Sequence, residues 1–306
     1  MWTVRGLASY PPDRGPAVVA LGTFDGVHRG HRAILGTAVD RALALGVPSV
    51  ACTFEPHPIE VLQPGRAPAA ITTLDERLAL IAATGIDGTL VIDFTPATAR
   101  IEPEAFVGDV VAGRLQAREV VVGFNHSFGR GARGNADLLG KLGERLGFAT
   151  HVVPPYTVDG VAVSSTAIRA ALAAGDVERA ATFLGRPYAV IGEVVRGAGR
   201  GRQLGFPTAN VRPDRPALAR VGVYACRMEV DGADHPAVVN VGVRPTFGET
   251  TLAVEVHVLD FSADLYGRRV RVTFLHRLRD ETRFPSVEAL RTQIEADVAQ
   301  ARALLR

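Results

Sequence analysis

The sequence has few cysteines, almost no lysine and no long apolar run. Its two cysteines, Cys52 and Cys226, lie far apart, which excludes a disulfide framework and a zinc cluster. No stretch reaches the roughly 18 apolar residues that a membrane-spanning helix needs. Residues 1–15 also lack a basic region followed by an apolar one, the pattern of a secretory signal. We therefore expect a cytoplasmic protein without membrane contacts.

Charge is nearly balanced, since 34 basic and 32 acidic residues leave a formal net charge of +2. This balance argues against a nucleic-acid-binding protein. Lys141 is the only lysine, so any phosphate would be bound by a guanidinium rather than an ammonium group. The 306 residues, 47% of them hydrophobic, predict two globular domains with separate cores. Self-association stays open.

The first half alternates short apolar strands with helical patterns, which predicts a parallel sheet with helices on both faces. Strand 17–21 is apolar throughout, as expected of a sheet buried on both sides. A helical stretch over 165–184 ends at Gly185-Arg186-Pro187, where we place the domain boundary. The other predicted strands are 48–54, 89–92, 119–122 and 150–153, and the other helices are 31–45, 74–83, 104–112 and 135–146.

The second half has a different pattern, in which short strands follow one another with turns such as Asp231-Gly232 between them. Consecutive strands of this kind predict an antiparallel barrel or sandwich. A single amphipathic helix closes the chain over 287–305 and is expected to pack on that barrel. The predicted strands are 188–195, 222–230, 235–243, 252–259 and 270–278.

A glycine- and histidine-containing segment, Gly22-Thr23-Phe24-Asp25-Gly26-Val27-His28-Arg29-Gly30-His31, follows the first predicted strand and opens the first helix. Glycines at such a turn let the backbone approach a phosphate, and the helix N-terminus adds donors and partial positive charge. His28 and His31 can share one face and donate hydrogen bonds during a displacement at phosphorus. Packing or capping alone is the weaker interpretation, and metal binding lacks a third ligand with obvious spacing. The candidate phosphate-binding residues here are Gly22, Phe24, Asp25 and Gly30.

A second candidate phosphate site begins the helical stretch at Val163-Ser164-Ser165-Thr166-Ala167-Ile168-Arg169. The hydroxyls of Ser164, Ser165 and Thr166, with Arg169 one turn later, could hold a triphosphate. Taken alone, the three hydroxyl residues are simply a helix N-cap.

Two further segments follow predicted strands, at the sheet edge where open α/β folds bind ligands. They are Thr53-Phe54-Glu55-Pro56-His57-Pro58 and Gly123-Phe124-Asn125-His126-Ser127-Phe128-Gly129. The adjoining stretch 129–134 has the spacing Gly-x-Gly-x-x-Gly but does not directly follow a strand. We interpret it as a surface turn, or as a lid that contributes Arg130 or Arg133, and not as a dinucleotide fingerprint.

The segments at 22–31 and 163–169 together resemble the two signatures of the nucleotidyltransferase superfamily. Its members attack the α-phosphate of a nucleotide and release pyrophosphate, with the histidines stabilising the transition state. The segments at 53–58 and 123–129 resemble the bacterial FMN adenylyltransferase module, in which an Asp is usual at the position of Glu55 and an aromatic at that of His126. The resemblance implies flavin contacts by Phe54, Pro56, Asn125 and Phe128.

A third glycine-rich segment, Gly197-Ala198-Gly199-Arg200-Gly201-Arg202-Gln203-Leu204-Gly205-Phe206-Pro207-Thr208-Ala209-Asn210, follows the first strand of the second half. Its glycines could close over phosphates. Thr208 and Asn210 lie two apart and share one face of an extended chain, with oxygen atoms suited to magnesium. Glycine-rich turns are common, so the segment alone is weak evidence. The candidate phosphate-binding residues are Gly199, Gly201, Arg202 and Gly205.

This segment resembles the riboflavin kinase signature, and the resemblance continues in order to the end of the chain through residues 222–225, 240–247, 254–261, 265–267 and 279–281. It implies that Thr208 and Asn210 bind Mg²⁺ and ATP phosphate. It also implies that Glu255 is the general base for a ribityl hydroxyl. Strand alternation would point Glu255 and His257 to the same face; without the resemblance, Glu255 would be taken for a solvent-facing carboxylate.

Both modules in this order resemble the bifunctional bacterial FAD synthetase. The resemblance implies an α/β Rossmann-like nucleotidyltransferase domain over 1–185 and an all-β six-stranded antiparallel barrel with a C-terminal helix over 186–306. The first would be the FMN adenylyltransferase and the second the riboflavin kinase. Riboflavin, FMN and ATP would be the small-molecule partners, with Mg²⁺ as cofactor. Two alternatives stay open: a nucleotidyltransferase for another small phosphate ester, and a flavin-binding regulator on the same scaffold.

Overall fold

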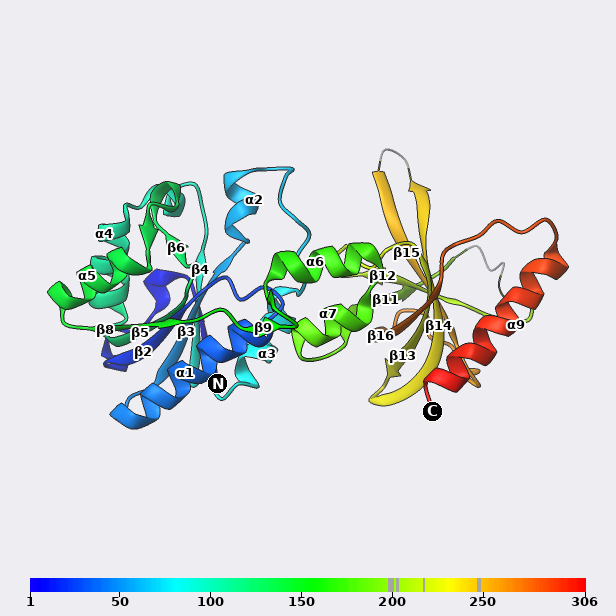
Figure 1. The fold of residues 1–306 in the computed structure, drawn as a ribbon, viewed down its shortest axis with the longest axis horizontal. Coiled ribbons are helices and arrows are strands. Elements are labelled where there is room, and N and C mark those ends of the chain that lie inside the picture. The colour runs from blue at the N-terminus through cyan, green and yellow to red at the C-terminus, as the bar shows by residue number, and fades with distance from the viewer. Residues whose placement is uncertain (198–200, 202–203, 217, 247–248) are drawn as a thin grey trace. The chain divides into compact units, whose positions relative to one another are not determined.

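The computed structural model describes residues 1–197, 201, 204–216, 218–246 and 249–306. Contacts divide the chain into two compact units, Met1–Ser165 and Thr166–Arg306 (Figure 1). The sequence predicts the boundary at 185/186, and the contacts place residues 166–185 with the second unit. The predicted domain boundary at 185/186 stays a prediction.

A six-stranded sheet forms the first unit, and every strand pair in it is parallel, which confirms the predicted α/β class. The strand order is β1-β4-β3-β2-β5-β8. The first strand was not predicted; it pairs with β4 at the edge of the sheet. The strands are β1 (Trp2–Arg5), β2 (Ala17–Leu21), β3 (Ser49–Glu55), β4 (Gly88–Asp93), β5 (Ala117–Gly123) and β8 (Ala149–Val153).

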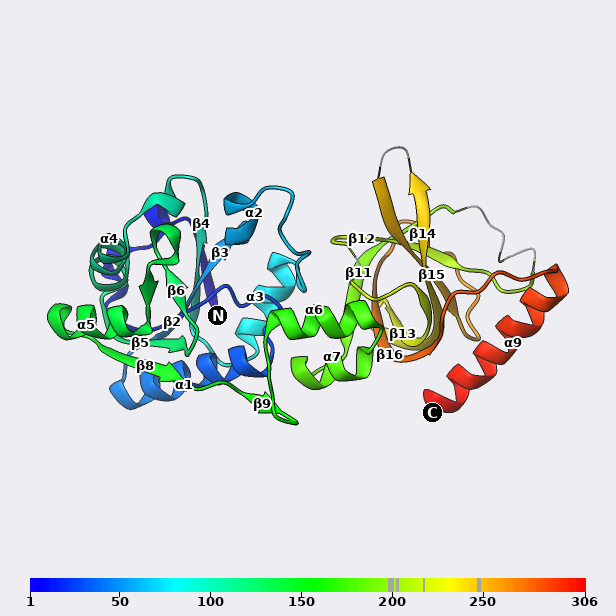
Figure 2. The same ribbon diagram turned by 45° about the horizontal axis from the view of Figure 1, so that its top comes forward.

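Helices cover both faces of this sheet, as Figure 2 shows. Val18 and Ala20 of β2 pack with α1 and α3, whereas Val19 and Leu21 pack with the helices on the other face. The helices are α1 (Arg29–Leu45), α2 (Pro58–Leu62), α3 (Leu74–Ala82), α4 (Pro103–Ala105), which continues as a π-helix over Phe106–Arg114, and α5 (Ala136–Leu146). Two short hairpins, β6 (Ser127–Phe128) with β7 (Gly134–Asn135) and β9 (Thr157–Val158) with β10 (Val161–Ala162), complete the unit.

The second unit contains a closed antiparallel barrel in the order β11-β12-β15-β14-β13-β16, which confirms the predicted six-stranded barrel. The rings of Tyr188 and Tyr224 meet that of Phe274 in its core, with centroids 5.6 and 5.2 Å apart. The strands are β11 (Tyr188–Val195), β12 (Ala209–Pro213), β13 (Gly222–Val230), β14 (Ala233–Thr246), β15 (Glu249–Val258) and β16 (Arg269–Arg279). Strand β12 was not predicted.

The helical stretch predicted over 165–184 is two helices, α6 (Ser165–Ala174) and α7 (Val177–Leu184). The helical conformation is interrupted at Gly175, whose φ of +85° is readily adopted only by glycine. The next residue, Asp176, caps α7 by accepting a hydrogen bond from the N–H of Arg179 at 2.9 Å. A glycine in left-handed geometry followed by a capping aspartate thus ends one helix and starts the next.

The C-terminal helix α9 (Val287–Leu304) packs against β13, β14 and β16 of the barrel. Its Ala301 contacts Val223, Ala225 and Val238 in an apolar cluster. Beside this cluster the buried carboxylate of Asp297 accepts bonds of 2.7–3.1 Å from the guanidinium of Arg279. None of the helices in the described residues has both the length and the apolar character needed to cross a membrane.

Replacing Asp297 with alanine should loosen the barrel, because Arg279 would lose its partner while remaining largely buried. Breaking such a pair costs about 3 kcal/mol. Amide hydrogen exchange in β13 and β14 should therefore accelerate. Glu295→Ala is the matched control, since Glu295 forms an exposed pair with Arg291 on the same helix and should change exchange little. Equal effects of the two substitutions would contradict this account.

Candidate active sites

The turn between β2 and α1 brings the two histidines of the first motif together. His28 is buried and caps α1, with its Nδ1 accepting a hydrogen bond from the backbone N–H of His31 at 3.2 Å. The two imidazole rings stack with their centroids 3.6 Å apart. Because Nδ1 of His28 is an acceptor, the proton of the neutral ring lies on Nε2. His28 is thus both a helix cap and a hydrogen-bond donor.

His31 is held in its neutral form. Burial lowers its pKa well below 6.5, and the nearby His28 and the positive charge of Arg77 lower it further. The ring edge of Phe24 lies against it, with centroids 5.4 Å apart, and its Nδ1 is buried without a hydrogen-bond partner in the described structure. A neutral imidazole can donate one N–H to an oxygen that gains charge, so the pair suits transition-state stabilisation rather than proton transfer.

The backbone of this turn is in an uncommon conformation, with φ of +52° at Phe24 and +39° at Val27. Both side chains are fully buried, and this packing holds the conformation. A Cβ on Gly30 would lie 3.2 Å from the ring of His28, so glycine leaves space for the histidine stack. Since the ring of Phe24 is inaccessible, its predicted role at a phosphate is restricted to its main chain.

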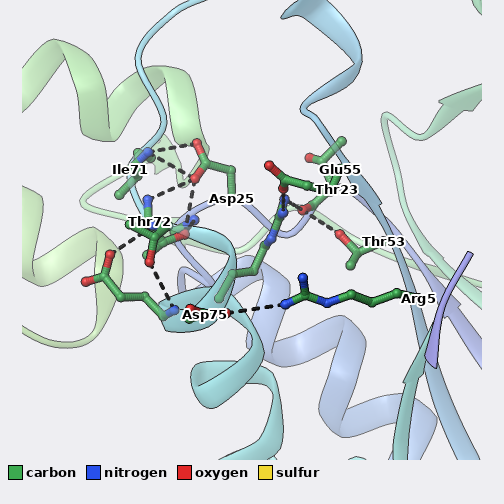
Figure 3. Close-up of polar contacts among 12 residues, drawn as sticks. Arg5, Thr23, Asp25, Thr53, Glu55, Ile71, Thr72 and Asp75 are labelled. Carbon is green, nitrogen blue, oxygen red and sulfur yellow. Dashed lines mark hydrogen bonds and ion pairs between the residues drawn. The ribbon is translucent and has the colours of Figure 1, made fainter. Parts of the chain in front are cut away.

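The carboxylate of Asp25, predicted to bind phosphate, is buried and forms its hydrogen bonds with another segment of the chain (Figure 3). It accepts hydrogen bonds from the backbone N–H groups of Ile71 and Thr72 at 3.0–3.1 Å, and from the Thr72 hydroxyl at 3.2 Å. The Thr72 hydroxyl in turn accepts the N–H of Gly26 at 3.1 Å. Asp25 therefore ties the histidine turn to the chain just before α3.

The second predicted motif joins the first through Ser165, whose hydroxyl donates to the carbonyl of Asp25 at 3.0 Å. The carbonyl of Val163 also lies close to Gly30, 3.7 Å from where a Cβ would stand. The structure thus brings the segments 22–31 and 163–165 together. Ser164 is half-buried; Thr166 and Arg169 follow on α6, where Thr166 is exposed and Arg169 half-buried.

A charged residue that the sequence did not reveal, Arg77 of α3, also contacts the histidine turn. Its Nη1 donates to the carbonyl of Thr23 at 3.0 Å, and its Nη2 pairs with the carboxylate of Glu55 at the end of β3. The hydroxyl of Thr53 donates to the same carbonyl at 2.9 Å (Figure 3). The sequence gave no sign of this contact, because Arg77 lies within a helical pattern more than 50 residues from Thr23.

Residues predicted to contact flavin lie at the ends of β3 and β5. Phe54 is half-buried and meets Phe94 edge to face at 5.8 Å, and Pro56 is exposed. Asn125 is exposed beside Phe124, an aromatic that was not predicted as a site residue and is 51% exposed. An accessible aromatic next to an amide, at the carboxyl end of a strand, is the kind of surface on which a flat ring can stack.

The other predicted flavin residue, Phe128, is buried in the core against Phe106 at 6.0 Å. The ring of His126 stacks on it at 5.7 Å, with an angle of 23° between the planes. Burial lowers the pKa of His126 to about 4, and its Nε2 has no hydrogen-bond partner among the described residues. His126 therefore packs as a neutral aromatic.

Residues 129–134, with Gly-x-Gly-x-x-Gly spacing, connect β6 to β7 in a hairpin rather than joining a strand to a helix. Both arginines of this turn, Arg130 and Arg133, pair with the carboxylate of Glu102. The expectation that no strand directly precedes this segment was wrong, since Gly129 follows β6. Because the segment leads into β7 and not into a helix, it still lacks the strand–turn–helix context of a dinucleotide site.

In the second unit, three polar residues lie side by side on adjacent barrel strands. Asn210 of β12 pairs with Glu255 of β15, and Glu255 pairs with Asn240 of β14. Directly opposite residues share one face, and the adjoining residues Val254 and Val256 are buried on the other. The row brings together the predicted Asn210 and Glu255, and Asn240, which the sequence pattern did not single out, lies beside them.

The chain before β12 approaches this row closely. A Cβ on Gly197 would lie 2.1 Å from Nδ2 of Asn210, and a Cβ on Gly201 would lie 3.2 Å from the Thr208 hydroxyl. Nδ1 of His257, two residues after Glu255 on the same face as predicted, lies 2.9 Å from the Pro207 carbonyl. The glycines are thus required by close backbone approach.

The glycine-rich segment was predicted to bind phosphate through four residues. Gly205 is exposed, with a φ of +88°, and Gly201 is half-buried. The other two, Gly199 and Arg202, lie outside the described residues.

The oxygen atoms at this site fit magnesium rather than a transition metal. The Thr208 hydroxyl, the Asn210 amide and the neighbouring Glu255 carboxylate are hard donors. In the described parts of the chain, no three His, Cys, Asp or Glu side chains gather as a metal site. An ion bound here would therefore need phosphate oxygens or water to complete its coordination.

Known families match both parts of the chain. A family model described as FAD synthetase matches residues 11–167, and one described as riboflavin kinase matches residues 184–305. A bifunctional riboflavin kinase/FMN adenylyltransferase of Pseudomonas fluorescens is 43% identical over 99% of this chain and 98% of its own. The protein of the same description from Escherichia coli (strain K12) is 38% identical over 99% of this chain and 97% of its own.

A solved structure also resembles the whole chain. It is a Streptococcus pneumoniae protein described as a macrolide-efflux protein, with a TM-score of 0.91, 31% identity and 99% of each chain covered. This likeness supports the architecture of a parallel α/β sheet followed by a closed barrel. The activity is inferred from the relatives in sequence and not from this structure.

His126 should make the first unit less stable in acid. Its folded pKa of about 4 lies below the unfolded value of 6.5, so the unfolded chain binds an extra proton as pH falls between these values. The free energy of unfolding should drop by about 3 kcal/mol across this window. His126→Phe keeps the stacked ring and should remove this loss. Urea unfolding of both proteins, followed by Trp2 fluorescence at several pH values, tests this prediction. If the free energies of unfolding of the variant and the wild type differ by the same amount at every pH, the prediction is contradicted.

Proposed function

The chain belongs to the family of bifunctional riboflavin kinase/FMN adenylyltransferases, and we propose that its two units divide the reactions of that family between them. It has riboflavin kinase and FMN adenylyltransferase activities, which produce FMN and FAD. In the proposed division, the histidine turn serves adenylyl transfer and the polar row on the barrel serves phosphorylation. The observation that carries the proposal is that the histidine turn and the barrel strands each bring together their own set of polar groups suited to phosphate chemistry.

In adenylyl transfer, a phosphate oxygen of FMN attacks the α-phosphorus of ATP, and the bond from that phosphorus to the bridging oxygen of pyrophosphate breaks. The charge that develops on the α-phosphate oxygens needs fixed donors. Neutral His28 and His31, together with the N-terminus of α1, would supply them. Ser164 and Ser165 would hold the departing pyrophosphate. For Thr166 and Arg169, which the contacts place with the second unit, binding of the triphosphate stays a prediction from the sequence. Phe54, Pro56, Asn125 and the exposed Phe124 would contact the flavin.

In phosphorylation, a ribityl hydroxyl of riboflavin attacks the γ-phosphorus of ATP, and ADP leaves. Glu255 would accept the hydroxyl proton as the new P–O bond forms. The amide of Asn240, beside it in register, would orient the carboxylate. Mg²⁺, which neutralises phosphate charge when bound, would be held by Thr208 and Asn210.

We propose that this chemistry takes place in the cytoplasm on the free small molecules riboflavin, FMN and ATP, without a nucleic acid or membrane partner. Two other functions are separable by experiment. A nucleotidyltransferase for another phosphate ester would form no FAD, and a flavin-binding regulator would bind flavin without turnover.

Chromatography of the flavins formed from riboflavin, ATP and Mg²⁺ tests the division between the units. His31→Ala should lower FAD formation by about 100-fold, because one transition-state donor is lost, and should leave FMN formation intact. Glu255→Gln should lower FMN formation by at least about 100-fold, because the base is lost, and should leave FAD formation from supplied FMN intact.

Each variant is the control for the other in activity, and urea unfolding of each variant reports whether the substituted unit has folded. The two-site proposal fails if either substitution lowers both activities equally in a folded protein. If the wild-type protein makes only FMN, the histidine turn serves a different substrate.

The magnesium proposal concerns the kinase reaction alone. Thr208→Val removes the hydroxyl with little change in size and should raise the Mg²⁺ concentration needed for half-maximal FMN formation by roughly tenfold, because one oxygen donor is lost. The Mg²⁺ dependence of FAD formation should not move. Thr292→Val, an exposed threonine of α9, is the matched control. An unchanged Mg²⁺ dependence in Thr208→Val would contradict the assignment.

A further inference from the structure

Arg77 is a buried charge that the proposed chemistry does not use. Its side chain extends from α3 and the residue is only 4% exposed. It joins two loops at the carboxyl edge of the sheet, since it donates to the carbonyl of Thr23 in the histidine turn and pairs with Glu55 at the end of β3. The first loop leads into His28, and the second carries Phe54 and Pro56.

Burial of this guanidinium is unfavourable unless its environment offsets the cost. Removing an ion from water costs several kcal/mol, and a guanidinium has five N–H groups to satisfy. Nε of Arg77 is buried without a hydrogen-bond partner in the described structure. Since an apolar residue would satisfy the packing of α3 at lower cost, the charge itself must matter at this position.

The start of α3 is fixed independently of Arg77. Thr73 and Glu76 form a capping box, in which the Thr73 hydroxyl accepts the N–H of Glu76 at 3.2 Å and Glu76 accepts the N–H of Thr73 at 2.9 Å. Just before them, Asp25 holds Ile71 and Thr72. Arg77 therefore extends from a helix that is already tied to the histidine turn, and its position is set before substrate binds.

The charge also acts on His31. The groups that act on the imidazole of His31 are His28, from the same turn, and Arg77, from α3; Glu55 is itself paired with Arg77. A fixed cation next to an imidazole disfavours its protonated form. Burial and His28 lower the pKa of His31 more than Arg77 does, and Arg77 acts in the same direction while it fixes the turn that carries this donor.

We propose that Arg77 is a positioning residue for adenylyl transfer, one that locks the main chain of the histidine turn to the flavin-side loop at Glu55. The proposal rests on the proposed function of the first unit. It assigns Arg77 no contact with substrate. Its effect passes through Thr23, Glu55 and His31, so it should appear in the rate of the bound complex rather than in substrate binding.

Steady-state kinetics of FAD formation from supplied FMN test the proposal with the full-length protein. Arg77→Met keeps the length of the side chain and removes its charge and donors. We expect kcat to fall by about 100-fold, as for a displacement of the reacting groups by about 1 Å, while KM for ATP and FMN stays within about threefold. The acid limb of kcat/KM should move to higher pH, because the pKa of His31 rises without the neighbouring cation.

Arg77→Lys separates the two roles. An ammonium keeps the charge but cannot serve the Thr23 carbonyl and the Glu55 carboxylate in the same fork geometry. We expect the acid limb to return to its wild-type position while kcat stays at least about tenfold below wild type. A wild-type acid limb combined with a lowered kcat would not arise if Arg77 merely supported the fold.

Arg41→Met is the matched control, because Arg41 also pairs with a buried carboxylate, that of Glu119, at 2.6–2.7 Å. It should lower stability without changing kcat. Urea unfolding followed by Trp2 fluorescence reports folding of the first unit in every variant, since FMN formation reports only that of the barrel. Wild-type kcat in folded Arg77→Met would overturn the proposal, as would a loss confined to KM, which would indicate direct contact with substrate. Failure of the proposed function itself would appear separately, as unimpaired FAD formation by His31→Ala.

Discussion

The buried carboxylate of Asp25 is the interaction on which the first site depends. It accepts the backbone N–H groups of Ile71 and Thr72, and so joins a turn after β2 to the beginning of α3. A buried carboxylate without these donors would be strongly unfavourable, so the two segments are fixed together whenever the unit is folded. This junction joins the turn that carries the histidine stack to the helix that carries Arg77.

In the proposed division, the two sites would bind phosphate by different physical means. In the first, uncharged imidazoles and a helix N-terminus provide donors, and the nearby charge of Arg77 is compensated by Glu55. In the second, oxygen atoms from neighbouring strands lie beside a glycine-rich segment that approaches them closely. The donor set suits a reaction in which charge builds on phosphate oxygens, and the acceptor set suits removal of a hydroxyl proton.

The local sequence pattern was enough to predict most strands and the fold class of both units, because apolar runs and turn residues are short-range signals. It failed for β12, whose Asn210, Arg212 and Pro213 interrupt the apolar pattern, since packing of that strand depends on its neighbours. The phosphate motifs were likewise visible as short strings. The contacts that support these motifs were not visible, because Ile71 lies 46 residues from Asp25 and Arg77 lies 54 residues from Thr23 along the chain.

The row of Asn210, Glu255 and Asn240 also limits where residues can be inserted into or deleted from the barrel. Side chains alternate between the two faces of a strand, so one inserted residue in β15 would turn Glu255 towards the interior and bring a valine to the site. Insertions and deletions are therefore tolerable in the turns between strands, but within β12, β14 and β15 they would separate the three residues. Circular permutation or loop grafting in this barrel has to preserve the phase of these strands, whatever happens to the chain between them.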